Sequence, residues 1–247
     1  MKLFQYWDSP SPPDQIAGWI EHFRINNPEF EHVLINKASA LEFIAVHYGP
    51  REVSAFEACA VPAMQADYIR LCLLEICGGV YVDADSQSRR PLSELFKDCP
   101  GSVLFAMGML VNNGFMYFPN ARDPFVSACL KVATDNIHAR RTNAVFTTAG
   151  PGVLIALRYI LDPSTQKIVD SKFDAPFVCT WGFPDVVERV RELVEVTPEL
   201  LEAFSAIDIM QAMDVVTWIG EEQPVYKQTT VHWTRWEGSI YNEVASE

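Results

Sequence analysis

Residues 78–87, GGVYVDADSQ, predict the central part of the fold and indicate its chemistry. A glycine pair comes first, an apolar run follows, and the run ends in two aspartates, Asp83 and Asp85, with one alanine between them. Residues two apart on a strand point to the same face, so a strand over residues 80–85 would bring the two acids together. Like charges held together require a cation or a shared proton. The stretch therefore predicts a cation site at the end of a strand.

Strand and helix patterns alternate on the N-terminal side of this stretch. Strands are predicted at residues 2–7 and 31–36, and helices at residues 12–28, 39–49 and 60–79. Ser39 is expected to cap the second helix at its start and Gly49 at its end, and Gly78 with Gly79 to stop the third. This alternation favours a parallel sheet with helices on its faces. In such α/β sheets, ligands bind beyond the carboxyl ends of the strands, which is where the two acids lie.

The remainder of the chain continues the α/β pattern less regularly. We expect strands at 102–110 and 113–119, helices at 123–140, 149–161, 185–196 and 198–213, and a closing strand with a tail at 225–236. No repeat or linker interrupts the 247 residues, a length within the range of one α/β domain. A single domain over residues 1–247 is the prediction.

Composition restricts the partners and the location. The net charge of −13 repels polyanions, so nucleic acid is not an expected partner. Residues 1–14 lack the apolar run of a signal peptide, and proline and glycine break up the uncharged segment 99–121. Six cysteines without a C-x-x-C pair are expected to stay reduced. We expect a cytoplasmic protein with at most peripheral contact with the inner face of a membrane; the pattern says nothing about its oligomeric state.

Several polar residues can be interpreted in two ways. Asp83 and Asp85 are either a solvated acidic turn or a divalent-metal site, since hard cations prefer carboxylate oxygen. Asp67 and Arg70 share a helix face and are either a surface pair or part of the same cleft. His232 is either structural or a ligand that completes the metal site.

The block from residue 65 to 87, QADYIRLCLLEICGGVYVDADSQ, resembles the signature of the DxD sugar transferases of glycosyltransferase family 32. That family includes yeast mannosyltransferases and bacterial capsular polysaccharide and lipooligosaccharide transferases, and it is distantly similar to the glucosylating domains of clostridial toxins. Supporting similarity lies in residues 3–7, 19–30, 111–125 and 147–154.

The resemblance implies a GT-A fold, a single Rossmann-like domain with a central, mostly parallel sheet flanked by helices. It also implies a retaining hexosyltransferase that uses Mn²⁺ or Mg²⁺ and a nucleotide-diphosphosugar, with a UDP-sugar as the expected donor. The acceptor would be a glycan, a lipid-linked glycan or a protein.

Roles for individual residues follow from the same resemblance. Trp7 would stack on the donor base, Asp67 and Arg70 would hold the donor sugar, and Tyr81 would line the donor pocket. Asp85 would ligate the metal, and Asp83 would meet the ribose, the sugar or metal-bound water.

Further roles by resemblance concern residues beyond the DxD block. Asn113, with Asn112 beside it, would approach the transferred sugar, and Gly150, Pro151 and Gly152 would shape the acceptor side. In the tail, His232 would be the third metal ligand, and Trp236 or Trp233 would cover the diphosphate. The expected catalytic residues are Asp83, Asp85 and Asn113.

Two other functions remain open at this point. A phosphohydrolase of the haloacid dehalogenase type also ends a strand in D-x-D, with Asp83 as the nucleophile. Lys167, Asp170 and Asp174 could then supply its lysine and acidic pair. A non-catalytic nucleotide-sugar-binding module is the second alternative, and turnover of a donor would distinguish it from an enzyme.

Overall fold

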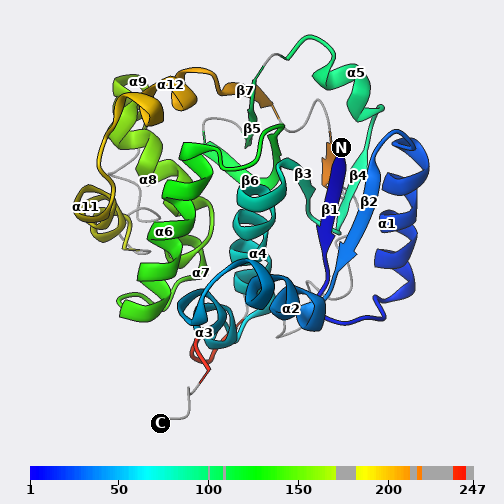
Figure 1. The fold of residues 1–247 in the computed structure, drawn as a ribbon, viewed down its shortest axis with the longest axis horizontal. Helices are drawn as coiled ribbons and strands as arrows, with labels where there is room; N and C mark the ends of the chain where they lie inside the picture. Colours follow the sequence, from blue (N-terminus) through cyan, green and yellow to red (C-terminus); the bar gives the residue numbers. More distant parts are fainter. Residues whose placement is uncertain (100, 108–109, 171–181, 212–215, 219–235, 243–247) are drawn as a thin grey trace.

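The computed structural model covers the chain and describes all residues except 100, 108–109, 171–181, 212–215, 219–235 and 243–247. Figure 1 shows a central sheet with helices on both of its faces. The strands are β1 (Lys2–Tyr6), β2 (Glu31–Ile35), β3 (Gly79–Val82), β4 (Ser86–Ser88), β5 (Val103–Met107), β6 (Leu110–Phe118), β7 (Asp208–Gln211) and β8 (Val216–Trp218). The helices are α1 (Asp14–Asn26), α2 (Lys37–His47), α3 (Pro50–Ala58), α4 (Pro62–Cys77), α5 (Leu92–Phe96), α6 (Pro124–Ala139), α7 (Val145–Thr148), α8 (Pro151–Leu161), α9 (Pro163–Asp170), α11 (Phe183–Leu193) and α12 (Pro198–Ser205).

The sheet is mixed but mostly parallel. Its order is β2-β1-β3-β6-β5-β7, and β1 pairs in parallel with both β2 and β3. Only β6 runs against its neighbours β3 and β5 among these six strands, while β7 is again parallel to β5. A separate pair, β4 with β8, lies outside this sheet. The α/β class predicted from the alternating pattern is confirmed.

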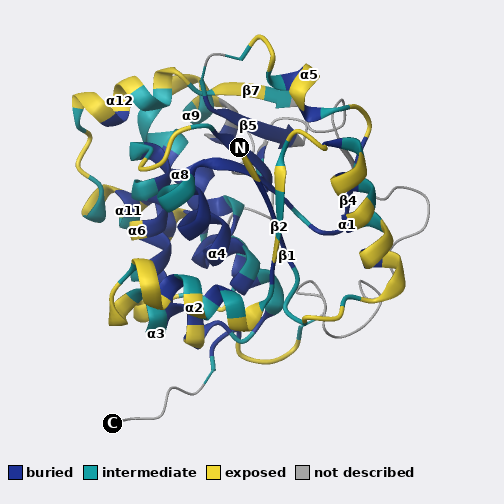
Figure 2. Ribbon diagram, turned by 45° about the vertical axis from the view of Figure 1, so that its right-hand side comes forward, coloured by how far each residue is buried: buried dark blue, intermediate teal, exposed yellow. Residues whose placement is uncertain are grey.

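Two apolar cores cover the two faces of the sheet. The larger core joins sheet residues such as Phe4 and Tyr81 to α4, α6 and α8. The smaller one packs Phe23 of α1 and Leu95 of α5 against strand residues such as Phe105. Figure 2 shows α4 almost entirely buried, whereas α1 has a buried and an exposed side. Because α4 is covered on all sides, its polar residues must find partners inside the protein.

The glycine pair does more than stop a helix. Gly78 ends α4 with φ +62° and Gly79 opens β3 with φ +108°, a region that other residues rarely adopt. A side chain on Gly79 would place its Cβ only 2.5 Å from the carbonyl oxygen of Lys2. The pair therefore lets the chain reverse within two residues and lets β3 pair directly with β1.

Several predicted boundaries were wrong. The strand at residues 80–85 ends at Val82, and Asp83 to Ser86 forms a turn in which the Ser86 amide donates to the Asp83 carbonyl, 3.1 Å. Gly49 does not end α2. It directly precedes α3, a helix that was not predicted from the sequence. The helix expected over 198–213 ends at Ser205, and strand β7 follows. The closing strand at 225–236 lies outside the described residues except for Trp236, which is not in a strand.

Ser39 has a different capping role from the one predicted. Asn36 caps α2, and Ser39 is the third residue of the helix, where its hydroxyl accepts a hydrogen bond from the Asn36 amide, 2.9 Å. The two residues form a reciprocal capping box.

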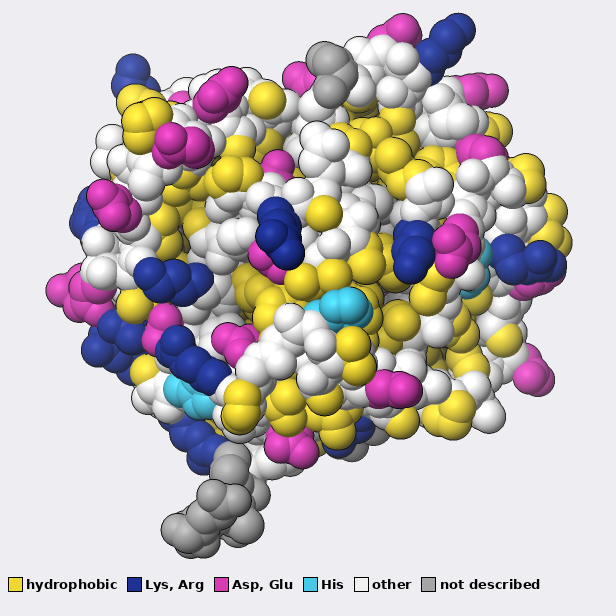
Figure 3. Space-filling view, viewed as in Figure 1, with side chains coloured by type: hydrophobic (Ala, Val, Ile, Leu, Met, Phe, Trp, Pro, Cys, Tyr) yellow, Lys and Arg dark blue, Asp and Glu magenta, His cyan; other side chains and the backbone are white. Residues whose placement is uncertain are grey.

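On the face drawn in Figure 3, acidic and basic side chains lie over apolar surface, and several Lys and Arg side chains gather at the lower left. In the part of the chain that the structure describes, no helix is long and apolar enough to span a bilayer.

Candidate active site

The residue that follows β3 and the middle of α4 meet because the strand and the second half of the helix have matching lengths. From Gly78 back to Arg70 the helix rises about 12 Å, at about 1.5 Å a residue. From Gly79 forward to Asp83 the strand advances about 13 Å, at about 3.3 Å a residue. Since helix and strand run in opposite directions across the glycine turn, Arg70 returns to the level of Asp83. The two side chains meet there: Arg70 Nη2 lies 2.9 Å from Asp83 Oδ1.

Arg70 is the centre of a buried polar cluster. Its Nη2 also lies 3.1 Å from Asp67 Oδ1, its Nη1 donates to the carbonyl of Asn113 at 2.6 Å, and its Nε donates to the carbonyl of Ala66 at 3.1 Å. Only 3% of the Arg70 side chain is exposed. One cation is thus shared by two carboxylates, and its hydrogen bonds fix the guanidinium plane.

The aromatic ring of Tyr81 completes the packing around this cation. The Arg70 guanidinium lies 4.5 Å from the centre of the ring, a cation–π contact. The Tyr81 hydroxyl is buried and has no hydrogen-bond partner among the described residues. Burial raises the pKa of this hydroxyl, so it stays a neutral donor.

The pKa values of the two buried partners in this cluster, Asp67 and Arg70, are both raised, for different reasons. Burial raises the pKa of Asp67 to about 6, since the nearby Arg70 offsets only part of that cost and the charge of Asp83 adds to it. Burial by itself would lower the pKa of Arg70, but Asp83, Tyr81 and Asp67 outweigh it, so the pKa is raised. Arg70 stays charged, whereas Asp67 changes its protonation state near pH 6.

The acids of the D-x-D motif are brought into place by a turn and by α1. Asp83 is one-third exposed and Asp85 is buried at 8% exposure. Ala84, between them, is buried in a small cluster with Ile16 and Ile20 of α1. The prediction that strand alternation brings the two acids to one face was therefore wrong, because the acids lie in a turn. Both acids nevertheless lie at the carboxyl end of β3, as predicted.

Strand β6 delivers the asparagines to this turn. It runs antiparallel to β3, with Val82 opposite Phe115, and the Asp83 amide donates to the carbonyl of Gly114 at 2.8 Å. Asn113 Nδ2 then donates to Asp67 Oδ1 at 2.9 Å. Asn112 Oδ1 accepts from the Gly114 amide at 2.5 Å. Asn113 is 4% exposed and joins the buried cluster, whereas Asn112 folds back on its own strand.

Two tryptophans flank the motif on the other side. Trp7 directly follows β1, and both Trp7 and Trp19 pack against the small cluster that contains Ala84. Both are partly buried. Trp7 thus lies beside the motif, and its stacking on the donor base stays a prediction. Trp19 is an aromatic neighbour that was not singled out from the sequence.

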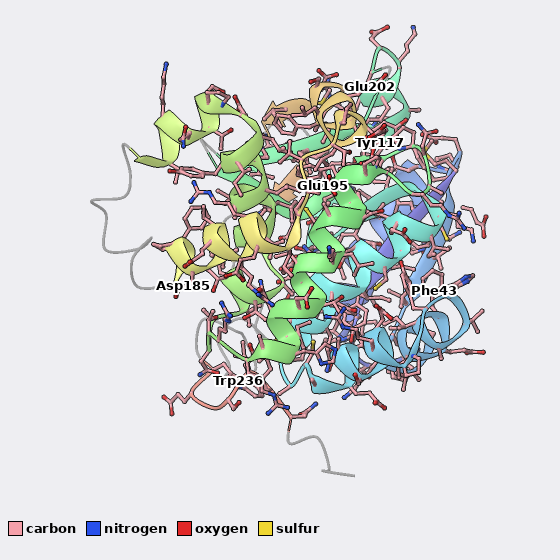
Figure 4. All side chains as sticks on the ribbon, turned by 60° about the vertical axis from the view of Figure 1, so that its left-hand side comes forward. Phe43, Tyr117, Asp185, Glu195, Glu202 and Trp236 are labelled. Atoms are coloured by element: carbon pink, nitrogen blue, oxygen red, sulfur yellow. The ribbon has the colours of Figure 1, made fainter. Side chains whose placement is uncertain are left out.

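The tail residues are only partly described. His232 and Trp233 lie outside the described residues. Trp236 donates through Nε1 to the carbonyl of Ser239 at 3.0 Å and packs against the larger core. In Figure 4 it lies at the lower edge of the view, and Tyr117 of β6 lies near the upper edge. Its predicted contact with the diphosphate stays a prediction.

The segment after Trp236 is attached to the body of the protein. Ile240 and Tyr241 are buried. The Ala60 amide donates to the carbonyl of Ile240 at 2.9 Å, and the Tyr241 hydroxyl donates to the carbonyl of Thr142 at 2.9 Å. These contacts tie the tail both to the start of α4 and to the segment before α7.

Sequence reasoning also missed Gly114 and Gln5. A Cβ on Gly114 would lie 2.4 Å from Asp83 Oδ2, so the carboxylate packs directly on the glycine. An isolated glycine inside a strand pattern is a signal of such close approach. Gln5 is fully buried; it donates to the Asp83 carbonyl at 3.4 Å, and its Oε1 is hydrogen-bonded to His32 Nε2 at 2.8 Å.

The described residues fit a divalent cation that is shared with a phosphate ligand. No group of three or more His, Cys, Asp or Glu side chains among them is arranged to hold a metal ion. Asp83 and Asp85 offer hard oxygen atoms, which Mg²⁺ and Mn²⁺ prefer. Sites of this kind use one or two acids and take further ligands from substrate phosphates and water. The donor set is therefore adequate for a metal bound together with a diphosphate.

Residues 13–100 match the family model of the glycosyltransferase sugar-binding region containing a DXD motif. The matched range includes α4, the glycine turn and both acids of the motif. The protein is a glycosyltransferase. The resemblance inferred from residues 65–87 is thereby confirmed.

Solved structures add information about the fold. The PaToxG glycosyltransferase is similar with a TM-score of 0.54 and 14% identity, over 83% of this chain and 84% of that chain. The ligand-free glycosyltransferase domain of the YGT toxin has a TM-score of 0.47 and 8% identity, over 90% and 81%. No curated protein matches the chain. The first likeness agrees with the GT-A architecture expected for this glycosyltransferase.

Proposed function

We propose that this glycosyltransferase moves a hexosyl group, with retention, from a UDP-sugar to a hydroxyl of a glycan, a lipid-linked glycan or a protein, with Mn²⁺ or Mg²⁺. The whole chain, residues 1–247, would act as one catalytic domain. The observation that carries the proposal is the buried cluster of Asp67, Arg70 and Asn113 directly beside Asp83 of the motif.

The cluster supports sugar binding because it leaves polar atoms unused. Asn113 Nδ2 is committed to Asp67 Oδ1, so its Oδ1 is the side-chain atom available to a ligand. Asp67 Oδ2 likewise makes no hydrogen bond within the described part of the chain. Fixed acceptors of this kind suit sugar hydroxyls, which donate well-directed hydrogen bonds.

Bond cleavage requires stabilisation of the diphosphate that leaves. A metal held by Asp83 and Asp85 would supply that charge stabilisation. The chain's own residues orient the sugar: Arg70 and Asn113 hold Asp67, and Gly114 and Gln5 hold the turn that carries Asp83. The acceptor proton passes to the leaving diphosphate, so a separate general base is not required. Trp7, beside the motif, would stack on the base.

The phosphohydrolase alternative is less well supported. Asp83 Oδ1 is paired with the Arg70 guanidinium, and this pairing lowers the nucleophilicity that an attacking aspartate needs. Of the residues it would recruit, Asp174 lies outside the described residues, and Lys167 is exposed on α9.

Calorimetric titration of UDP and GDP, each with and without Mn²⁺, tests the proposal. We expect UDP to bind at least tenfold more tightly with Mn²⁺, and Asp85→Asn to remove that metal effect without a loss of the fold. Asp185→Asn is the matched control, because Asp185 is an exposed acid on α11 (Figure 4). Equal binding of UDP with and without metal, or an Asp85→Asn variant that behaves like the wild type, would refute the metal assignment.

A further inference from the structure

The turn between α7 and α8 reaches the buried cluster through a single glycine. Gly150 is the residue before the first turn of α8, and an ideal Cβ on it would lie 2.9 Å from Asp67 Oδ2. It would also lie 3.0 Å from Phe146 Cα and 3.0 Å from the Val145 carbonyl oxygen. The Gly150 φ of −82° suits any residue, so space alone explains why a glycine is required here.

Asp67 is therefore held from two sides. Asn113 and Arg70 hold Oδ1 by hydrogen bonding and charge, at 2.9 and 3.1 Å. Gly150 packs against Oδ2, where the N-terminus of α8 also favours a negative charge. Because only 9% of the side chain stays exposed, the carboxylate has one orientation open to a ligand.

We propose that Gly150 is a positioning residue for donor-sugar recognition, because it sets the place of the Asp67 carboxylate. The inference rests on the proposed function, in which Asp67 accepts a hydroxyl of the donor sugar. It differs from the expectation that residues 150–152 shape the acceptor side, since the contact of Gly150 is with the donor-side acid. An added methyl group must push Asp67 Oδ2 by about 0.5 Å or more to restore ordinary contact, and displacements near 1 Å cost up to about 10²-fold in rate or binding.

The test compares Gly150→Ala with the wild type in donor hydrolysis without acceptor. The donor is the one that turns over in a panel of UDP-glucose, UDP-galactose, UDP-N-acetylglucosamine and GDP-mannose. We expect KM for that donor to rise about 10- to 100-fold, while the Kd of the free nucleoside diphosphate stays within twofold. The sugar half of the donor alone would then have lost affinity, which a general loss of stability does not produce.

A matched control loosens the same turn without touching Asp67. Thr148, at the end of α7, donates from its hydroxyl to the Ala144 carbonyl at 2.8 Å, and Thr148→Val removes that bond at nearly equal volume. We expect a lower Tm with KM within threefold of the wild type. If Thr148→Val raised KM as much as Gly150→Ala does, loosening the turn would be enough to explain the effect. The proposal would then be overturned.

Asp67→Asn separates this inference from the proposed function. If Asp67→Asn leaves KM unchanged, or no donor in the panel turns over, the assigned role of Asp67 fails and the inference fails with it. If Asp67→Asn raises KM and Gly150→Ala does not, only the inference is overturned. The double variant Asp67→Ala/Gly150→Ala covers a folding failure of the single one: removing the carboxylate should recover part of the lost stability, since the contacts with Phe146 and Val145 remain, and should abolish the added effect on KM. A double variant as poorly folded as the single one would refute the contact as the cause.

Discussion

Replacing Arg70 with methionine tests the central claim that one cation holds two carboxylates in the interior. Methionine fills similar volume but leaves Asp67, at 6% exposure, without its cation. Removing one partner of a buried ion pair costs about 3–5 kcal/mol. The variant also loses the hydrogen bonds to Asn113 and Ala66. We expect the free energy of unfolding to fall by about 4 kcal/mol at pH 8.

The loss should depend on pH in a defined direction. In the folded wild type the pKa of Asp67 is raised from 3.8 to about 6. The folded state therefore binds this proton more tightly than the unfolded state does, and the resulting stability is complete below about pH 4 and lost as the pH rises through 6. At pH 5 Asp67 is mostly neutral in the wild type, and more so in the variant, because Arg70 no longer lowers its pKa; the carboxyl group then depends less on Arg70. The difference between variant and wild type should thus shrink to about half at pH 5.

Urea unfolding followed by tryptophan fluorescence at pH 5, 6, 7 and 8 measures both effects. Arg24→Met is the control, because the pair that Arg24 forms with Glu21 is exposed on α1, and such pairs contribute little. A loss below about 1 kcal/mol for Arg70→Met at pH 8, or a loss that is the same at every pH, would show that Arg70 does not stabilise the buried Asp67 carboxylate.

Two further changes test other contacts of the site and its supports. Gly114→Ala would place a Cβ 2.4 Å from Asp83 Oδ2, so the carboxylate must move by about 1 Å and kcat for donor hydrolysis should fall about 10²-fold. The control is Gly18→Ala in α1, where the added Cβ meets open space and kcat should stay unchanged. A Gly114→Ala variant with kcat within threefold of the wild type would contradict this expectation. Tyr241→Phe removes the hydrogen bond to the Thr142 carbonyl and should lower the free energy of unfolding by about 1 kcal/mol in the same urea assay. An unchanged urea midpoint would show that the tail is held by its other contacts and not by this hydrogen bond.

The sequence was sufficient for the parts of the fold that local physics determines. The apolar helix, the glycine pair and the apolar strand appear in the structure as α4, a turn with positive φ and β3. Their lengths alone return Arg70 to Asp83. The pairing of Asp67 with Arg70 was one of two interpretations, and burial decides between them.

The parts that could not be predicted depend on distant contacts. Residues 208–211 follow a helical pattern, but they form β7 because β5 offers a free parallel edge, with Val103 opposite Asp208. The turn at Asp83 depends on β6, whose Gly114 carbonyl accepts from the Asp83 amide. Likewise, the closeness of Gly150 to Asp67 joins two residues far apart in the sequence, and no local pattern specifies it.

The charges at the motif fit a binding site better than a purely stabilising ion pair. Asp67 and Asp83 share one cation, Arg70, and Asp85 adds a third carboxylate two residues beyond Asp83. Like charges held together repel one another, so the set is costly for folding. A divalent cation bound at Asp83 and Asp85 would relieve that repulsion. Residues that cost folding free energy while they gain affinity for a ligand are the arrangement expected of a preorganised site.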